Sequence, residues 1–291
     1  MKTLAVIVTY FPDDANIENI KAIAAQVDQV LVSDNTPEQV EKFESLKGSN
    51  IKVVMNKQNK GIAFALNQGL KLARHQVVDY LFTFDQDSLI TEGYTKRLIE
   101  IGQVFYEDRG IYPTLIGPTY RHPTEEVDYQ SPESNDGDYR EATVLMSSGN
   151  CLRMASLPEG CTFDDDLFID YVDFDFCFDL MQQGKLIIQA NKVELIHSLG
   201  NLTTHHILGK TLQTSNHNYQ RRYYITRNRR VVWNRYKESQ KEWIQLDKKM
   251  ELIEWLKIIF LEKEKIKKCQ SIILGKRDAK NGKLGVYSHQ K

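Results

Sequence analysis

Pairs of acidic residues in the spacing Asp-x-Asp are the first feature of this sequence that could do chemistry. They occur four times in the 291 residues, at 85/87, 136/138, 164/166 and 173/175, so the spacing alone selects none of them. Asp85 and Asp87 differ from the rest because they directly follow an apolar run at 80–84. Two carboxylates at a strand end can hold a hard divalent cation against a diphosphate. We expect this pair to bind metal or phosphate, with a solvated turn as the alternative.

A second acidic group stands where a helix is predicted to begin, over 171–183. Asp170, Asp173 and Asp175 crowd this start, beside an apolar stripe that contains Phe174 and Phe178. Capping and the helix dipole explain such carboxylates at about 0.3–1 kcal/mol each, but a third in so apolar a setting is excess. Apolar surroundings raise the pKa of a carboxyl group towards that of a useful base. A capping role and a catalytic base both remain open at this point.

Two further residues stand at the ends of apolar runs. Asp34 follows the run at 29–33 and either accepts hydrogen bonds from a ribose or base, or closes a turn with Thr36 and Pro37. His197 follows the run at 193–196 and is either structural or a ligand. No Gly-x-Gly-x-x-Gly follows the first apolar run, which counts against nicotinamide or flavin chemistry.

The elements that must position these residues alternate along the first 120 residues. Strands are predicted at 3–9, 29–33, 51–55 and 80–84, and helices at 15–26 and 61–75. This alternation predicts an α/β fold whose parallel strands bind ligands beyond their carboxyl ends. Further along we expect a loop or short edge at 119–141, strands at 143–146, 186–189 and 193–196, and basic helical sequence after 209.

The net charge of −1 conceals a strong asymmetry. Residues 1–200 carry 17 Lys and Arg against 31 Asp and Glu, whereas residues 201–291 carry 21 against 8. This split predicts an acidic working domain and a basic region that meets something anionic. Residues 242–261 place an aromatic-rich apolar face among lysines, which suits a helix in a membrane interface. Packing on its own domain or on a second copy is the alternative.

The remaining composition is that of an ordinary globular protein. No apolar run approaches the length of a membrane span, and the start of the chain does not read as a signal peptide. The four cysteines show no metal-ligand spacing and are expected to be reduced thiols in a cytoplasm.

Together, several stretches resemble the family 2 glycosyltransferases with a GT-A fold, and among them the bacterial rhamnosyltransferases. The matching stretches are VIVTY at 6–10, VSDNT at 32–36, NKGIAFALNQG at 59–69, FDQDS at 84–88, SSGNCL at 147–152, FDDDLFIDYVDFDF at 163–176, HSLG at 197–200, YYITRN at 223–228 and GKRDAKNGKLG at 275–285. The resemblance implies a Rossmann-like, mixed but mostly parallel sheet flanked by helices. It implies a catalytic domain over 1–209, with a nucleotide-binding half to about 118 and an acceptor-side half over 119–209, followed by a basic helical region over 210–291.

The resemblance also implies roles for single residues. The nucleotide sugar is expected to contact Thr9, Tyr10, Asp34, Asn59, Gly61, Asn67 and Asp85. Asp85, Asp87 and His197 are expected to hold Mg²⁺ or Mn²⁺. Asp173 takes the place of the catalytic base, with Asp175 as its rival, because Val172 stands where many relatives have Glu. Arg227 either contacts the diphosphate or is structural.

The implied activity is an inverting, metal-dependent transfer of L-rhamnose from dTDP-L-rhamnose to a lipid-linked cell-surface polysaccharide precursor. Alternative donors are UDP-sugars, for galactofuranosyl or other hexosyl transfer. Two other rivals are a metal-dependent nucleotide hydrolase and a catalytically inactive membrane-binding module. The expected partners are the donor, a lipid-linked glycan and the inner face of the cell membrane, reached through the basic C-terminal helices. Nucleic acid is not expected, and homo-oligomerisation is left open.

Overall fold

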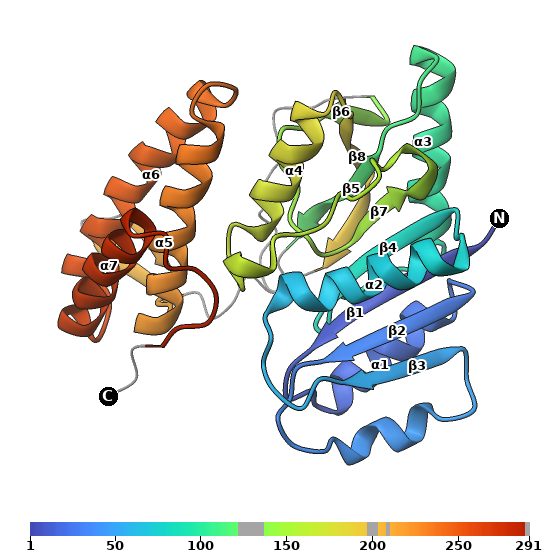
Figure 1. Ribbon diagram of the computed structural model, residues 1–291, viewed down its shortest axis with the longest axis horizontal. Coiled ribbons are helices and arrows are strands. Elements are labelled where there is room, and N and C mark those ends of the chain that lie inside the picture. The colour runs from blue at the N-terminus through green and yellow to red at the C-terminus, as the bar shows by residue number, and fades with distance from the viewer. Residues whose placement is uncertain (122–136, 197–202, 208–209, 289–291) are drawn as a thin grey trace. The chain divides into compact units, whose positions relative to one another are not determined.

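The computed structural model describes residues 1–121, 137–196, 203–207 and 210–288 (Figure 1). The chain divides into two compact units, each with its own apolar cluster. The first unit comprises Met1–Asp165 and Val172–Ser198, and the second comprises Asp166–Tyr171 and Leu199–Lys291. The boundaries predicted from the sequence, near 118 and at 209/210, stay predictions.

The first unit is built on a mixed sheet. Within the described residues the sheet has eight strands in the order β3-β2-β1-β4-β7-β5-β8-β6. Four of them are parallel neighbours: β1 (Thr3–Thr9), β2 (Gln29–Asp34), β3 (Ile51–Met55) and β4 (Tyr80–Asp85). The others are β5 (Leu115–Arg121), β6 (Tyr139–Glu141), β7 (Asn150–Arg153) and β8 (Ile187–Ile196), of which β7 runs antiparallel to both β4 and β5. The short β6 pairs antiparallel with β8.

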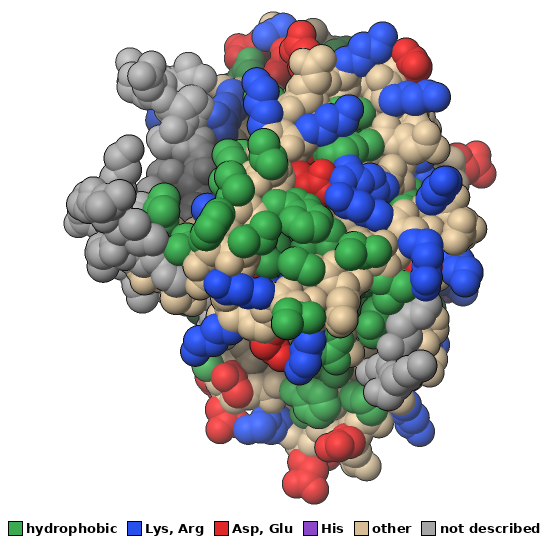
Figure 2. Space-filling view, turned by 90° about the vertical axis from the view of Figure 1, so that its left-hand side faces the viewer, with side chains coloured by type: hydrophobic (Ala, Val, Ile, Leu, Met, Phe, Trp, Pro, Cys, Tyr) green, Lys and Arg blue, Asp and Glu red, His purple; other side chains and the backbone are tan. Residues whose placement is uncertain are grey.

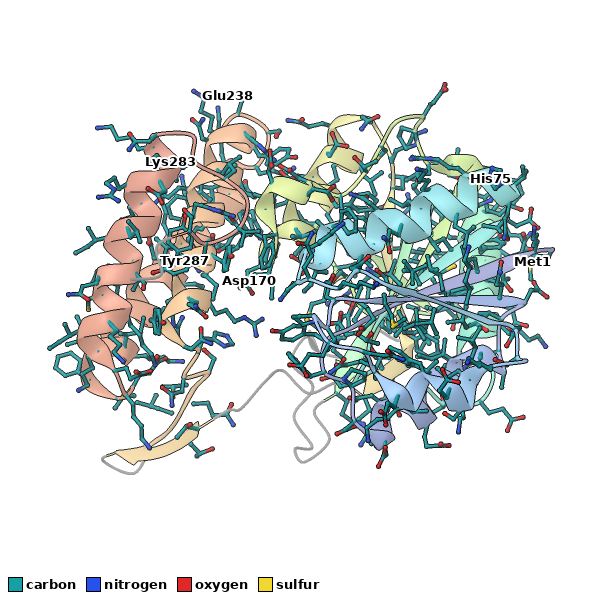
Figure 3. The ribbon with its side chains drawn as sticks, turned by 60° about the horizontal axis from the view of Figure 1, so that its bottom comes forward. Met1, His75, Asp170, Glu238, Lys283 and Tyr287 are labelled. Carbon is teal, nitrogen blue, oxygen red and sulfur yellow. The ribbon has the colours of Figure 1, made fainter. Side chains whose placement is uncertain are left out.

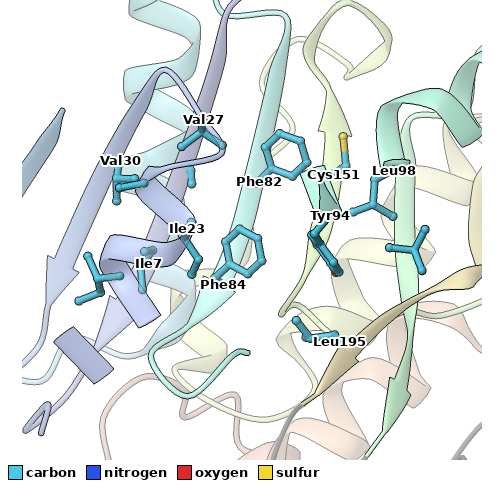
Figure 4. Packing of buried hydrophobic residues seen from close by; sticks show 14 of the residues in the cluster. Ile7, Ile23, Val27, Val30, Phe82, Phe84, Tyr94, Leu98, Cys151 and Leu195 are labelled. Carbon is cyan, nitrogen blue, oxygen red and sulfur yellow. The ribbon is translucent and has the colours of Figure 1, made fainter. Parts of the chain in front are cut away.

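Helices cover both faces of this sheet. They are α1 (Asp14–Ala24), α2 (Ile62–Gln76), α3 (Tyr94–Arg109) and α4 (Val172–Gln182). All seven residues of β1 are buried, as expected of a strand covered on both sides. Ile7 packs in the cluster that α1 and α3 build on one face (Figure 4). Val6 points to the other face, where a Cβ added to Gly69 of α2 would lie 2.5 Å from its own Cβ.

The predicted parallel strands are confirmed, and β2 and β4 extend one residue further to include Asp34 and Asp85. The predicted strand at 143–146 is wrong, and the chain pairs instead at β7. The reason is that backbone carbonyls in this segment bond to side chains rather than to a ladder. Met146 O accepts from Asn150 Nδ2 at 2.6 Å and from the hydroxyl of Tyr120 at 3.1 Å. The two strands expected at 186–189 and 193–196 are one strand, β8, with a register shift opposite β5.

The second unit is mainly helical. It contains the hairpin β9 (Thr203–Ile207) and β10 (Lys210–Thr214), then α5 (Tyr219–Tyr236), α6 (Lys241–Phe260) and α7 (Lys265–Lys280). The expectation of helix directly after residue 209 is therefore wrong for β10. A Cβ added to Gly275 of α7 would lie 2.8 Å from the carbonyl oxygen of Tyr223 on α5, so glycine permits the close helix contact. Among the described residues, no helix is both long and apolar enough to cross a bilayer.

Candidate functional site

Three of the predicted residues lie at one edge of the first unit's sheet. In the parallel register Thr9 is opposite Asp34, and Val8 is opposite Asp85. The carboxyl ends of β1, β2 and β4 therefore deliver these polar side chains to the same edge, where open parallel sheets bind their ligands.

Asp34 is a fully buried carboxylate with one oxygen unmet. Its Oδ1 accepts hydrogen bonds from the hydroxyls of Thr9 at 2.7 Å and Thr36 at 2.8 Å. Its Oδ2 is buried and finds no hydrogen-bond donor within the described part of the chain. Burial raises the pKa of Asp34, against the lowering effect of the two hydroxyls and of the Thr36 backbone N–H. A buried acceptor without a partner is costly, so this oxygen is suited to a donor group on a ligand.

Beyond β1, two aromatic side chains point into solvent beside Asp34. Tyr10 is 46% exposed and Phe11 is 53% exposed, and their rings meet edge to face at 4.6 Å. Phe11 has a φ of 48°, in the left-handed region that bulky residues avoid. Its backbone N–H donates to the Thr36 hydroxyl at 2.8 Å. Backbone strain of this kind concentrates at functional sites, and the strain at Phe11 was not foreseen from the sequence.

Gln86, between the two aspartates, is a second residue that the sequence reasoning missed. Its side-chain amide accepts from Tyr10 N at 2.7 Å and donates to Tyr10 O at 3.2 Å. Its own carbonyl accepts from the side chains of Asn16 and Asn19, both at 3.2 Å. The turn that carries Asp85 and Asp87 is therefore fastened to the end of β1. A primary amide can both donate and accept hydrogen bonds. The presence of Gln86 between the two aspartates is the only sequence signal for this clamp, in which its side chain bonds to both backbone groups of Tyr10.

The loop at 147–150 supports the same turn from the other side. Asp85 N donates to the Ser148 hydroxyl at 3.1 Å, and this hydroxyl lies 2.5 Å from that of Ser88. Gly149 N donates to Thr83 O at 2.7 Å. Gly149 has a φ of 83°, and a Cβ there would lie 2.6 Å from the Tyr94 hydroxyl. The side chains of Asp85 and Asp87 are themselves half-buried.

Asp173 lies in the first turn of α4 and reaches the same neighbourhood. With Asn150, Phe163 and other residues it lines a cavity of about 10 Å³. The buried Tyr120 hydroxyl lies 3.1 Å from both Met146 O and Ser148 O. Burial raises the pKa of Tyr120 well above its ordinary value, and the nearby charges of Asp173 and Asp85 raise it further. Two of the predicted carboxylates, from α4 and from β4, therefore lie near one phenol.

Asp173 and its rival Asp175 differ in burial. Asp173 is half-buried, and its Oδ1 accepts from Phe174 N at 3.0 Å. Asp175 is only 6% exposed. A base must reach the hydroxyl that it deprotonates, so the geometry favours Asp173 over Asp175.

The remaining predicted nucleotide contacts have structural partners. Asn59 Oδ1 accepts from Gly61 N at 3.0 Å, and Gly61 O accepts from Asn35 Nδ2 at 3.0 Å. These bonds shape the turn that begins α2. Asn67 bonds to both the N–H and the carbonyl of Phe163, at 2.9 and 2.8 Å. Its nucleotide-binding role stays a prediction.

In the described part of the chain, the Asp85–Asp87 pair could coordinate a divalent cation. No group of three or more His, Cys, Asp or Glu side chains suited to a metal ion occurs among the described residues. His197, the third expected ligand, lies outside the described residues. The carboxylates are hard oxygen donors of the type that Mg²⁺ and Mn²⁺ prefer, so they fit such an ion as a partial ligand set.

Arg227 lies in the second unit, where its side chain bonds to other groups of the protein. Its side chain is fully buried, and it donates to the carbonyls of Gly285 at 2.6 Å and of Asp166 and Leu167, both at 3.1 Å. Its Nε donates to the side chain of Asn228 at 2.9 Å. Of the two roles considered for Arg227, the structural one is the one that these contacts support.

The segment that Arg227 holds is a strained one. Phe168, Asp170 and Tyr171 have φ values of 67°, 62° and 65°. Asn228 Nδ2 donates to the carbonyls of Leu167, Ile169 and Asp170 at 2.7–2.8 Å. The Asp170 carboxylate pairs with Arg221 at 3.0 Å, and Figure 3 labels Asp170 within this unit. This segment, which ends where α4 begins in sequence, is therefore held within the second unit by α5.

Comparisons with known proteins agree with this geometry. Residues 6–103 match the family model "Glycosyl transferase family 2". The dTDP-rhamnosyl transferase RfbF of Shigella flexneri is 26% identical over 238 residues, which cover 77% of each chain. Two solved structures share the fold: GalNAc-T7 with UDP, GalNAc and Mn²⁺ has a TM-score of 0.61 at 14% identity over 84% of this chain, and S. aureus TarS has 0.52 at 15% over 96%. The chain spans 49% and 44% of those two chains, about half their length.

The strand-end carboxylates, the mixed sheet and these matches define the class of protein. The chain has the GT-A fold expected from its sequence, and its residues 6–103 form a glycosyl transferase family 2 domain. The protein is a glycosyltransferase, which confirms the predicted enzyme class.

Proposed function

We propose that this glycosyltransferase moves L-rhamnose from dTDP-L-rhamnose to a hydroxyl group of a lipid-linked precursor of cell-surface polysaccharide, with inversion and with the help of a divalent metal. The donor is suggested by the relative RfbF, which is described as a dTDP-rhamnosyl transferase. The observation that carries the proposal is the arrangement of Asp34 and Asp85 at one sheet edge, with Asp85 and Asp173 both near Tyr120.

The nucleotide half of the donor is proposed to bind at Asp34 and Tyr10. The unmet Oδ2 of Asp34 can accept a hydrogen bond from an N–H of the base or a hydroxyl of the sugar attached to it. Thr9 fixes the carboxylate by donating to Oδ1. The exposed Tyr10 ring offers a flat apolar surface to a base.

Asp85 and Asp87 are proposed to hold Mg²⁺ or Mn²⁺, with His197 as a further ligand. A divalent ion bound there would offset the negative charge that develops on the departing diphosphate. A solved structure of the same fold contains UDP and Mn²⁺. Gln86 and Ser148 keep the turn that bears the two carboxylates in place.

Asp173 is proposed to act as the base. It would take the proton of the acceptor hydroxyl while that oxygen forms a bond to the anomeric carbon of rhamnose. The bond from this carbon to the diphosphate breaks on the opposite side, and dTDP leaves, which inverts the anomeric configuration. Positioning both reactants in line supplies much of the rate increase.

Donor identity is tested by the thermal shift of the purified protein with dTDP-L-rhamnose, UDP-sugars and GDP-sugars, each with and without Mn²⁺. A ligand that binds only the native state raises its melting temperature. We expect a metal-dependent shift with dTDP-L-rhamnose alone. A shift only with a UDP-sugar would replace the proposed donor. Release of free rhamnose at full rate without an acceptor would make the protein a hydrolase.

A further inference from the structure

The second unit exposes a continuous apolar stripe along α6. Leu246, Met250, Ile253, Leu256 and Phe260 recur at spacings of three and four residues, which places them on one side of the helix. They are between 43% and 71% exposed. We call these five residues the α6 apolar face. Figure 2 looks at the side on which Figure 1 draws α6 and shows hydrophobic side chains gathered there among Lys and Arg.

Three of the four acidic residues of α6 are turned away from this face, whereas the fourth, Glu242, is exposed four residues before Leu246. Asp247 lies 3.3 Å from Arg229 and also accepts from Trp233 Nε1 at 2.8 Å. Glu251 pairs with Arg230 at 2.5 Å, and Glu254 pairs with Arg229 at 3.1 Å. All three arginine and tryptophan partners belong to α5. Arg229 and Arg230 are therefore neutralised by acidic residues of α6.

The lysines of the same region stay on the surface. Residues 241–280 contain 11 Lys and Arg and 7 Asp and Glu, so the segment is only moderately basic. Of the acids, only Glu242 and Glu264 are exposed, whereas of the bases only Lys268 is buried. Internal pairing thus removes most of the negative charge from the surface and leaves the positive charge there. Lys249 and Lys257 lie three and four residues from members of the α6 apolar face, so they stand on the same side of the helix among its apolar residues.

We propose that the α6 apolar face docks flat onto the surface of an anionic lipid bilayer. Its apolar side chains would enter the boundary between headgroups and acyl chains, while the long side chains of Lys249 and Lys257 reach out to anionic headgroups. A second copy of the chain fits less well, because a symmetric contact through this face would bring lysines against lysines while three of the four acidic residues of α6 are paired with α5. The inference deepens the proposed function and rests on it, since it names the surface that brings the enzyme to a lipid-linked acceptor.

Vesicle co-sedimentation of the full-length protein tests the proposal. Vesicles of phosphatidylcholine alone are compared with vesicles that also contain phosphatidylglycerol, at low and at high salt. We expect binding to the anionic vesicles that weakens with salt and is slight on neutral ones. Lys249→Glu should weaken anionic binding by about fivefold or more, as expected when one basic contact is lost. The pair Leu256→Gln and Phe260→Gln should reduce binding further, because both side chains are exposed and their loss spares the fold.

Matched controls lie in the first unit. Lys52→Glu and Ile111→Gln change exposed residues of the same types outside the α6 apolar face and should bind vesicles like the wild type. Equal vesicle binding by wild type and by the α6 variants would overturn the proposal. The proposal would also be overturned if light scattering showed a wild-type dimer and monomeric α6 variants. The α6 apolar face would then be an interface with a second copy of the chain. The donor thermal shift is measured without lipid. The absence of a shift with dTDP-L-rhamnose would therefore refute the proposed donor without bearing on vesicle binding.

Discussion

Asp34 and Arg227 are both fully buried charged groups, but the two units of the chain use them differently. Asp34, at the sheet edge of the first unit, is held through one oxygen while the other has no donor in the described structure. Arg227, inside the second unit, donates to three backbone carbonyls and one side chain. At a sheet edge that binds ligands, an unmet atom on a buried polar group favours a binding role, whereas a fully bonded group favours a structural one. Burial of a charge alone therefore does not identify a site residue.

The largest effect should come from replacing Arg227, the buried charge with a structural role. Arg227→Met would remove four hydrogen bonds made by a buried guanidinium group and would leave Gly285 O without this donor, so we expect a loss of about 3–5 kcal/mol in the free energy of unfolding. Urea unfolding measures it. Arg235→Met, at an exposed position of the same helix, should change the free energy by about 0.5 kcal/mol or less. An Arg227→Met protein of unchanged stability that failed to bind donor would reverse the assignment.

The substitution Asp34→Asn tests the binding role of the other buried charge. An amide keeps an acceptor for Thr9 and Thr36 but can present an N–H where the ligand needs an acceptor, so donor affinity should fall by about tenfold or more. Titration calorimetry with dTDP-L-rhamnose and Mn²⁺ measures the change. Asp28→Asn, at the opposite end of β2, should lose stability through its bonds to Thr3 while keeping donor affinity. Donor affinity that is unchanged in Asp34→Asn would remove Asp34 from the site.

The difference in stability between the wild type and Asp34→Asn should depend on pH with a definite sign. Burial raises the pKa of Asp34 above the ordinary 3.8, so the native state holds this proton more tightly than the unfolded state does. The wild type therefore loses stability, relative to Asp34→Asn, as the pH rises from below 3.8 through the raised pKa. Thermal unfolding across the acid range follows the difference, and the opposite slope would rule out burial as the dominant influence on this carboxyl group.

Smaller effects should distinguish strain from binding at Phe11. Phe11 and Val77 both have positive φ, 48° and 51°, but only Phe11 lies beside Asp34. Asparagine tolerates this conformation, so Phe11→Asn and Val77→Asn should each raise the melting temperature by about 1–2 °C. Donor affinity should fall severalfold in Phe11→Asn and stay unchanged in Val77→Asn. Equal donor affinity in both variants would make the strain at Phe11 incidental.

Much of the sheet edge could be predicted because its signals are local. Continuous apolar runs predict strands buried on both faces, and Asp34 and Asp85 stand at their ends. Arg227 could not be settled in this way, because its carbonyl partners at Asp166, Leu167 and Gly285 are 58–61 residues away. The clamp by Gln86 and the φ of Phe11 depend on contacts with β1 and Thr36 that no sequence pattern carries.

The most direct test of the proposed transfer compares Asp173→Asn with Asp175→Asn. Each protein is given radiolabelled dTDP-L-rhamnose and a membrane extract that supplies the acceptor, and its donor thermal shift is recorded alongside. We predict that Asp173→Asn loses transfer by about 10²–10⁴-fold while its donor shift persists, as expected when a base is removed. Asp175→Asn should retain transfer. Transfer at the wild-type rate by Asp173→Asn, or a loss confined to Asp175→Asn, would refute Asp173 as the base.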